Sequence, residues 1–110
     1  MEVSALRLGL SMVRHAAYRG AGTLAGLAPD PEVPDSPDGR FHKLNEPAIG
    51  RVVVFERSGM RRVDATLSAA DGTWKIANLD PSLMCVVIGF DDQGIQNAAI
   101  QDWVKPYVPE

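Results

Sequence analysis

The fold is decided by the stretch from Arg51 to Phe90, RVVVFERSGMRRVDATLSAADGTWKIANLDPSLMCVVIGF, in which short apolar runs alternate with turn residues. We expect strands at 51–57, 61–68, 72–79 and 84–90, and a fifth at 97–104 in the segment NAAIQDWV. The breaks between them carry turn residues, namely Ser58-Gly59, Asp71-Gly72, Asp80-Pro81 and Asp91-Asp92-Gln93-Gly94. Five closely spaced strands leave little room for helix, so the sequence predicts an all-β fold, a small antiparallel β-sandwich.

The alternation of apolar residues within these runs predicts which side chains form the core. The inward set is Val52, Val54, Val63, Ala65, Leu67, Trp74, Ile76, Val86 and Ile88, and the opposite face carries Val53, Phe55 and Val87. Apolar residues on both faces indicate more than one packed layer, so the N-terminal region or another subunit must cover the second face. The single cysteine, Cys85, lies in the most apolar run, which favours a buried packing role over a reactive thiol.

The N-terminal region has a different pattern. Apolar residues occupy alternate positions, as in a half-buried strand: Leu6, Leu8, Leu10 and Met12. A helix remains the alternative, because one helical face would carry Val3, Leu6, Leu10 and Val13, but Gly9 would cost that helix about 1 kcal/mol. The glycine-rich segment 19–27 is typical of a first strand with a bulge or a close backbone contact. We therefore expect an extended arm at 1–18 and a sandwich domain at 19–110.

A long loop rich in proline and acidic residues is expected at 29–47, within that domain. Its first part, PDPEVPDSPDG, has almost nothing to bury. A long loop inside a compact domain is often functional, although a tolerated insertion is the alternative. The following segment FHKLN, which begins at Phe41, is interpreted as a short strand or a contact point.

Composition limits the classes of function. The chain has 110 residues, enough for one domain, and a net charge of -3 that offers no basic surface for nucleic acid. No apolar stretch approaches the roughly 20 residues that cross a bilayer, and no targeting segment is evident, so folding in a cytoplasm is the simplest expectation.

No catalytic set or metal site is expected. His15 and His42 have no second ligand at a metal-binding spacing, and Asp91 and Asp92 are better explained as turn residues than as calcium ligands. No serine lies in a nucleophile elbow, and no glycine-rich phosphate loop is present in the sequence. We therefore predict no enzyme activity and no cofactor.

Exposed aromatic and basic residues are the remaining candidates. Trp74, Trp103 and Tyr107 could stack on a sugar, but core or interface packing is the favoured interpretation. The pair Arg61-Arg62 stands at a predicted hairpin tip, where it is either solvated or paired with an acidic partner.

The segment GRVVVFERSGMRRVDATLSAADGTWKIANLDPSLMCVVIGFDDQGIQNAAIQDWVKP resembles a small domain of tailed-bacteriophage virion proteins. That domain is related in fold to transthyretin-like, carboxypeptidase-regulatory-like and immunoglobulin-like sandwiches. The matching pieces are FER, SAADGTW, IANLDP, VVIGFDD and the closing NAAIQDWVKP. The resemblance covers about the last 60 residues and brings no catalytic residues with it.

The resemblance implies a structural component of a virion, assembled in the host cytoplasm and placed in the tail, tail tip or baseplate. Its partners would be other virion proteins and copies of itself, held through the N-terminal arm and the sheet edges. The expected contact residues are Leu6, Leu8, Leu10, Met12, Phe41, Trp103 and Tyr107. The alternatives are a capsid decoration protein and a free carbohydrate- or protein-binding module, for which a glycan or a host receptor would be the ligand.

Overall fold

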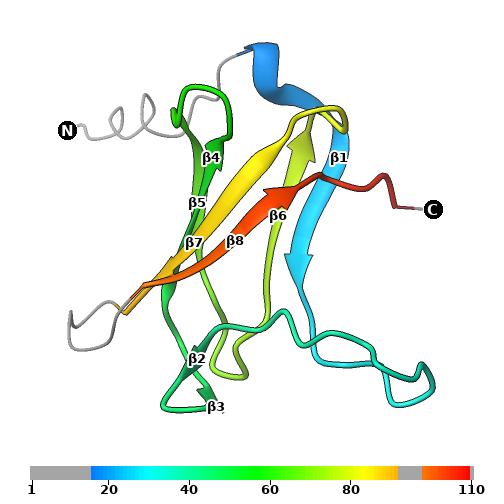
Figure 1. The fold of residues 1–110 in the computed structure, drawn as a ribbon, viewed down its shortest axis with the longest axis vertical. Helices are drawn as coiled ribbons and strands as arrows, with labels where there is room; N and C mark the ends of the chain where they lie inside the picture. The colour runs from blue at the N-terminus through cyan, green and yellow to red at the C-terminus, as the bar shows by residue number, and fades with distance from the viewer. Residues whose placement is uncertain (1–15, 92–97, 110) are drawn as a thin grey trace, which may run out of the picture.

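A computed structural model of the chain describes residues 16–91 and 98–109. In these residues a single-turn 3₁₀ helix, η1 (Ala16–Tyr18), is followed only by strands (Figure 1). The strands are β1 (Arg19–Gly26), β2 (His42–Lys43), β3 (Glu46–Pro47), β4 (Arg51–Glu56), β5 (Arg62–Leu67), β6 (Trp74–Leu79), β7 (Cys85–Phe90) and β8 (Ala99–Val104). All pairings between them are antiparallel, which confirms the predicted all-β class.

Two sheets form the body of the protein. The larger has the strand order β5-β4-β7-β8, and the smaller pairs β1 with β6 (Figure 1). The chain after β8 then crosses to β1, where Thr23 and Tyr107 exchange backbone hydrogen bonds of 2.6 and 2.9 Å. This arrangement is compatible with a small β-sandwich whose two layers are tied together along one side.

The core lies between the two sheets. The larger sheet contributes Val52, Val54, Val63, Cys85 and Val87, and the smaller contributes Leu24, Trp74, Ile76 and Leu79. Cys85 is fully buried, as predicted. Burial, and secondarily the charge of Glu56, raises the pKa of its thiol to about 11, so the thiolate is strongly disfavoured.

The predicted inward face of β7 is wrong by one residue. Val54 pairs with Val87, so Val87 points into the core, and the neighbouring Val86 and Ile88 lie on the outer face of the sheet. Because side chains alternate along a strand, a one-residue error reverses every assignment.

The predicted inward face of β5 also needs correction. A register shift opposite Val54 and Phe55 adds a residue to β5, so Val63 enters the core as predicted. Ala65, however, pairs with Val53 on the outer face, and Leu67 is exposed. A bulge of this kind interrupts the alternation along the strand, so side chains two positions apart on either side of it point to opposite faces.

The glycines of β1 permit the close approach that the sequence indicated. The β1–β6 register shifts on both sides of Gly22. A Cβ atom at Gly20 or Gly22 would lie 2.8 or 2.7 Å from the carbonyl oxygen of Leu79, which is closer than van der Waals contact allows. Only glycine therefore fits at these two positions of the bulged strand.

Within the predicted loop at 29–47, β2 and β3 form a small hairpin, so the segment that begins at Phe41 contains the short strand that was one of its two interpretations. Residues 27–41 contain no helix or strand. Their inner end is fixed by Trp74, whose indole Nε1 donates to the Gly39 carbonyl at 3.0 Å. Phe41 is only 8% exposed and also belongs to the buried part of the protein.

Candidate interaction surface

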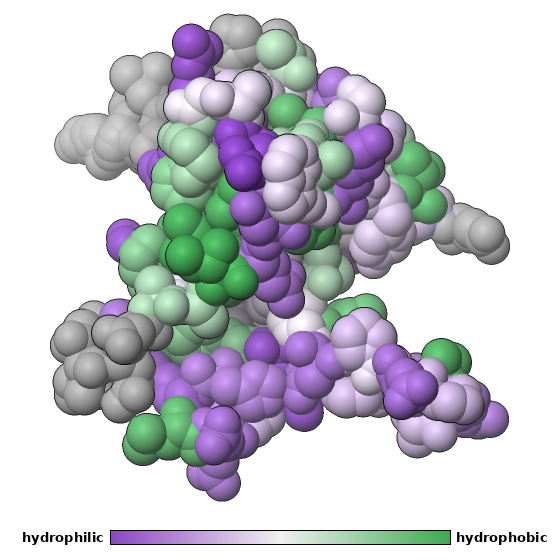
Figure 2. Space-filling model, in the orientation of Figure 1, coloured by the Kyte–Doolittle hydropathy of each residue, from purple (hydrophilic) through white to green (hydrophobic). Residues whose placement is uncertain are grey.

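The most exposed large apolar side chains of the larger sheet lie on its edge strand, β8. Ile100 and Trp103 are each 64% exposed. Ile100 pairs with the outward-facing Ile88 of β7, so the two side chains share one face. Figure 2 shows hydrophobic surface over this β7 and β8 region, bordered by hydrophilic side chains. An exposed apolar surface with a polar rim is typical of a protein interaction site.

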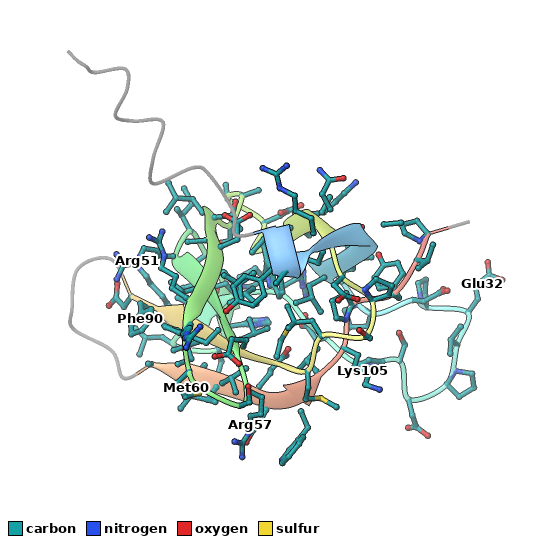
Figure 3. All side chains as sticks on the ribbon, turned by 90° about the horizontal axis from the view of Figure 1, so that it is seen from above. Glu32, Arg51, Arg57, Met60, Phe90 and Lys105 are labelled. Carbon is teal, nitrogen blue, oxygen red and sulfur yellow. The ribbon has the colours of Figure 1, made fainter. Side chains whose placement is uncertain are left out.

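Trp103 is held in an unusual conformation within this surface. Its φ angle is 59°, in the left-handed region that a bulky residue rarely adopts. The Arg57 guanidinium lies 4.4 Å from the centre of the indole ring, and Arg57 Nε donates to Asp102 Oδ1 at 2.7 Å. Figure 3 shows Arg57 projecting from the body on the same side as Met60. Residues with strained backbone conformations cluster at functional sites, and here the strained residue is an aromatic one on the surface of the protein.

On each edge strand of the larger sheet, one backbone amide is already hydrogen-bonded to an aspartate side chain. Asp102 Oδ1 accepts the Trp103 N–H at 2.8 Å on β8, and Asp64 Oδ1 accepts the Ala65 N–H at 2.8 Å on β5. These amides are therefore not offered to an added strand, which is a common protection of exposed edges. Contact through the side chains of β8 is favoured over strand addition at these positions.

The C-terminal segment extends this surface to the other sheet. Tyr107 pairs with Thr23 through the backbone, which leaves its side chain half exposed, and the neighbouring Val108 is exposed as well. The Pro106 side chain between them and β8 is buried.

The predicted contact residues thus have different positions. Trp103 and Tyr107 are on the surface, 4 residues apart in sequence. Phe41 lacks the exposure that a contact role requires, because its ring fills a space bounded by Gly50 and Gly89. Leu6, Leu8, Leu10 and Met12 lie outside the described residues. Ile100 was missed, although its place in the apolar run NAAI could have indicated it.

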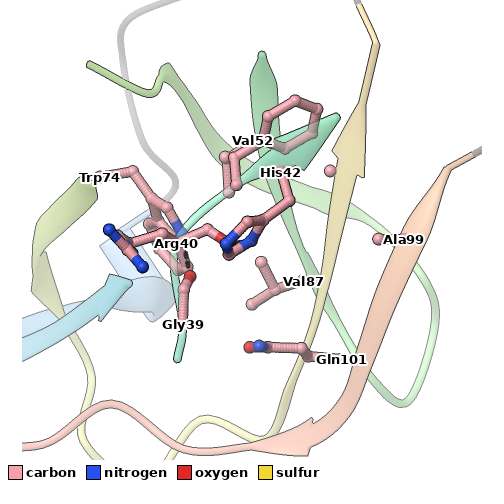
Figure 4. Close-up of a pocket in the computed structure, with 10 residues that line it drawn as sticks. Gly39, Arg40, His42, Val52, Trp74, Val87, Ala99 and Gln101 are labelled. Atoms are coloured by element: carbon pink, nitrogen blue, oxygen red, sulfur yellow. Dashed lines mark hydrogen bonds between the residues drawn. The ribbon is translucent and has the colours of Figure 1, made fainter. Parts of the chain in front are cut away.

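A second feature is a pocket of about 140 Å³ at the end of the core nearest the β2–β3 hairpin. Figure 4 shows Trp74 and Gln101 on opposite sides of it, with Arg40 and His42 between them. Its apolar wall comes from inward positions of the larger sheet, including Val52, Val87 and Ala99.

The two ionisable side chains that line the pocket, Arg40 and His42, both pair with Asp38. Arg40 makes two hydrogen bonds to the carboxylate of Asp38, at 2.9 Å from Nε and 2.8 Å from a terminal nitrogen. The Arg40 guanidinium thereby holds the pKa of Asp38 far below its usual range. His42 Nε2 is 3.2 Å from Oδ2 of the same carboxylate. The other ring nitrogen, Nδ1, lies 2.9 Å from the Arg40 carbonyl oxygen, which can only accept a hydrogen bond. These pairs leave little free charge in the pocket for a ligand.

The described residues offer no assembled chemistry beyond these contacts. Within 16–91 and 98–109, no group of three or more His, Cys, Asp or Glu side chains could hold a metal ion. In the same residues, no serine hydroxyl or cysteine thiol forms a hydrogen bond to a histidine. No helix in this part of the chain is long and apolar enough to span a membrane.

Comparisons with protein-family models, with curated proteins and with solved structures found no match to this chain.

Proposed function

We propose that the protein is a non-enzymatic structural component of a tailed-bacteriophage virion, with a transthyretin-like sandwich, placed in the tail, tail tip or baseplate. It contacts neighbouring subunits through the surface formed by Ile100, Trp103 and the C-terminal segment, together with the arm at 1–18. The exposed, strained Trp103 on the edge strand carries the proposal.

Three observations support an assembly role. Tryptophan and arginine are both enriched among the residues that dominate binding at the centres of protein interfaces, and Trp103 stacks with Arg57. The Arg57–Asp102 pair fixes the ring before any partner arrives, which lowers the entropic cost of binding. The resemblance of the segment from Gly50 to Pro106 to a virion domain agrees with this use.

The test is the protein content of particles. Particles released from the organism that carries this gene should be banded on a density gradient and analysed by quantitative mass spectrometry. The proposal predicts that the protein bands with the particles at a fixed copy ratio to their major components. Its presence only in the soluble fraction would contradict the proposal. A copy number equal to that of the capsid subunit would favour a capsid decoration protein.

A free binding module is the second candidate, and the geometry of Trp103 favours it specifically. An exposed indole beside an arginine and a carboxylate is also a surface on which a sugar ring can stack and form hydrogen bonds. Binding of the isolated protein to a glycan array, lost on Trp103→Ala with the fold retained, would support this candidate. The absence of such binding would leave the assembly role.

A further inference from the structure

The loop between β4 and β5 displays an apolar side chain next to two arginine side chains. Met60 is 47% exposed and is followed by the exposed Arg61 and Arg62, a group that we name the hairpin tip. Neither guanidinium forms an ion pair within residues 16–91 and 98–109. The Glu56 carboxylate in the same turn partly offsets the charge of Arg61, so the tip offers apolar contact and a net positive charge.

The tip is rigid before any contact is made. The carboxylate of Glu56 accepts hydrogen bonds from the Ser58 hydroxyl and from the Gly59 and Arg61 amides. The Met60 amide donates to the Glu56 carbonyl at 2.9 Å. These bonds order the turn that presents Met60, so little conformational entropy remains to be lost on docking.

A complementary surface lies in the loop between β1 and β2. Val33 is 51% exposed and is flanked by the exposed carboxylates of Glu32 and Asp35, a group that we name the acidic loop. It is also ordered, because the Asp30 carbonyl accepts from the Val33 amide at 3.1 Å and the Ser36 hydroxyl accepts from the Asp30 amide at 2.9 Å. The acidic loop thus has the same plan as the tip, with the opposite charge.

We propose that the hairpin tip of one copy docks on the acidic loop of a second copy. Met60 packs against Val33, and Arg61 and Arg62 pair with Glu32 and Asp35. The inference rests on the proposed function only in assuming that copies of the chain contact one another. It adds the partner, the two surfaces and the polarity of the contact.

The two surfaces lie at opposite ends of the protein, which determines the kind of assembly. The tip is at one end of the longest axis, and the acidic loop is toward the other (Figure 1). A contact between different surfaces leaves one tip and one loop free in every dimer, so addition continues until a ring closes or a filament grows. The contact is small, and we expect each one to be weak and to gain strength from repetition.

A charge exchange tests this contact. One variant, Arg61→Gln with Arg62→Glu, makes the tip acidic, and the other, Glu32→Lys with Asp35→Asn, makes the loop basic. Asparagine is chosen because Asp35 has a φ of 60°, which asparagine tolerates. All four side chains are exposed, so both variants should melt like the wild type. Self-association is measured by sedimentation velocity at low and high salt, up to about 1 mM protein because small interfaces are weak.

The wild type should self-associate. The association should weaken at high salt, because the Debye length falls to about 3 Å at 1 M ionic strength and the charges on the two surfaces are then screened. Each variant alone should associate at least about tenfold more weakly, since the tip and the loop then carry net charges of the same sign instead of opposite signs. An equimolar mixture of the two variants should associate again, because each supplies the surface that the other has lost. Unchanged association of the single variants, no recovery in the mixture, or a monomeric wild type would overturn the inference.

Trp103→Ala separates this inference from the proposed function. The variant leaves both charged surfaces intact, so it should retain the salt-sensitive part of the association. If the charge-exchange variants associate normally and Trp103→Ala does not associate, the tip-to-loop contact is refuted and the proposed function is not.

Discussion

Replacing Gly50 by alanine is expected to destabilise the protein by about 1–3 kcal/mol, the usual cost of overpacking a core. A Cβ atom at Gly50 would lie 2.2 Å from Cε1 and 2.3 Å from Cζ of the Phe41 ring. The ring has little room to retreat, because a Cβ at Gly89 would be 2.9 Å from its other side. Alanine at position 50 must therefore displace Phe41, which joins the loop at 27–41 to the core.

The assay is urea unfolding followed by tryptophan fluorescence in a Trp103→Phe background, in which the signal comes from Trp74 beside this loop. The control is a double-mutant cycle with Phe41→Leu, which replaces the ring by a smaller side chain. The alanine at position 50 should cost at least about 1 kcal/mol less in the Phe41→Leu background, because residues in contact are coupled. An equal cost in both backgrounds, or no cost in the wild type, would refute the packing of Phe41 between Gly50 and Gly89.

Three further predictions concern separate parts of the chain. Hydrogen bonds from Ser58, and then from Gly59 and Arg61, lower the pKa of Glu56, so its carboxylate stabilises the fold above about pH 4.5 and this contribution is lost on acidification. The free energy of unfolding of Glu56→Gln should therefore fall less steeply than that of the wild type in urea titrations from pH 7 to pH 3. The buried Cys85 should react with a thiol reagent at pH 8 only as fast as the protein opens, and a burst of labelling in the native state would contradict its burial. Removal of residues 1–15 should leave the circular dichroism and melting temperature close to those of the full chain while reducing self-association; the cut spares Tyr18, which packs against the core, and unchanged association would exclude the arm as a contact.

The strands could be predicted from the sequence because their signals are local. The Asp71-Gly72 turn, for example, is marked by a glycine that adopts a φ of 84° and by a carboxylate that accepts the Thr73 amide. The observed β4 and β7 lie within one residue of the expected runs 51–57 and 84–90 at each end. Turn chemistry and period act over a few residues, so a single sequence contains them.

The inward face of β7 could not be predicted from alternation, because four consecutive residues are apolar: Cys85, Val86, Val87 and Ile88. The register against β4 decides it, and that register pairs residues that are 29 to 39 positions apart.

The candidate surface was predicted only in part for the same reason. Trp103 could be named as an exposed aromatic candidate, but its stacking with Arg57 joins residues from β8 and from the loop after β4. Phe41 gave the opposite error. Its burial depends on two glycines, Gly50 just before β4 and Gly89 in β7, and no local pattern contains that information.

The most direct test of the assembly account is the mass of the purified full-length protein in solution, measured by light scattering coupled to size exclusion over a range of concentrations. The account predicts a defined oligomer with a mass that is a multiple of 11.9 kDa. Trp103→Ala should shift it toward the monomer at an unchanged melting temperature, whereas Leu67→Ala, an exposed apolar side chain on the opposite edge strand β5, should not. A wild-type protein that remains monomeric at every concentration, or a Trp103→Ala variant that assembles like the wild type, would contradict the account.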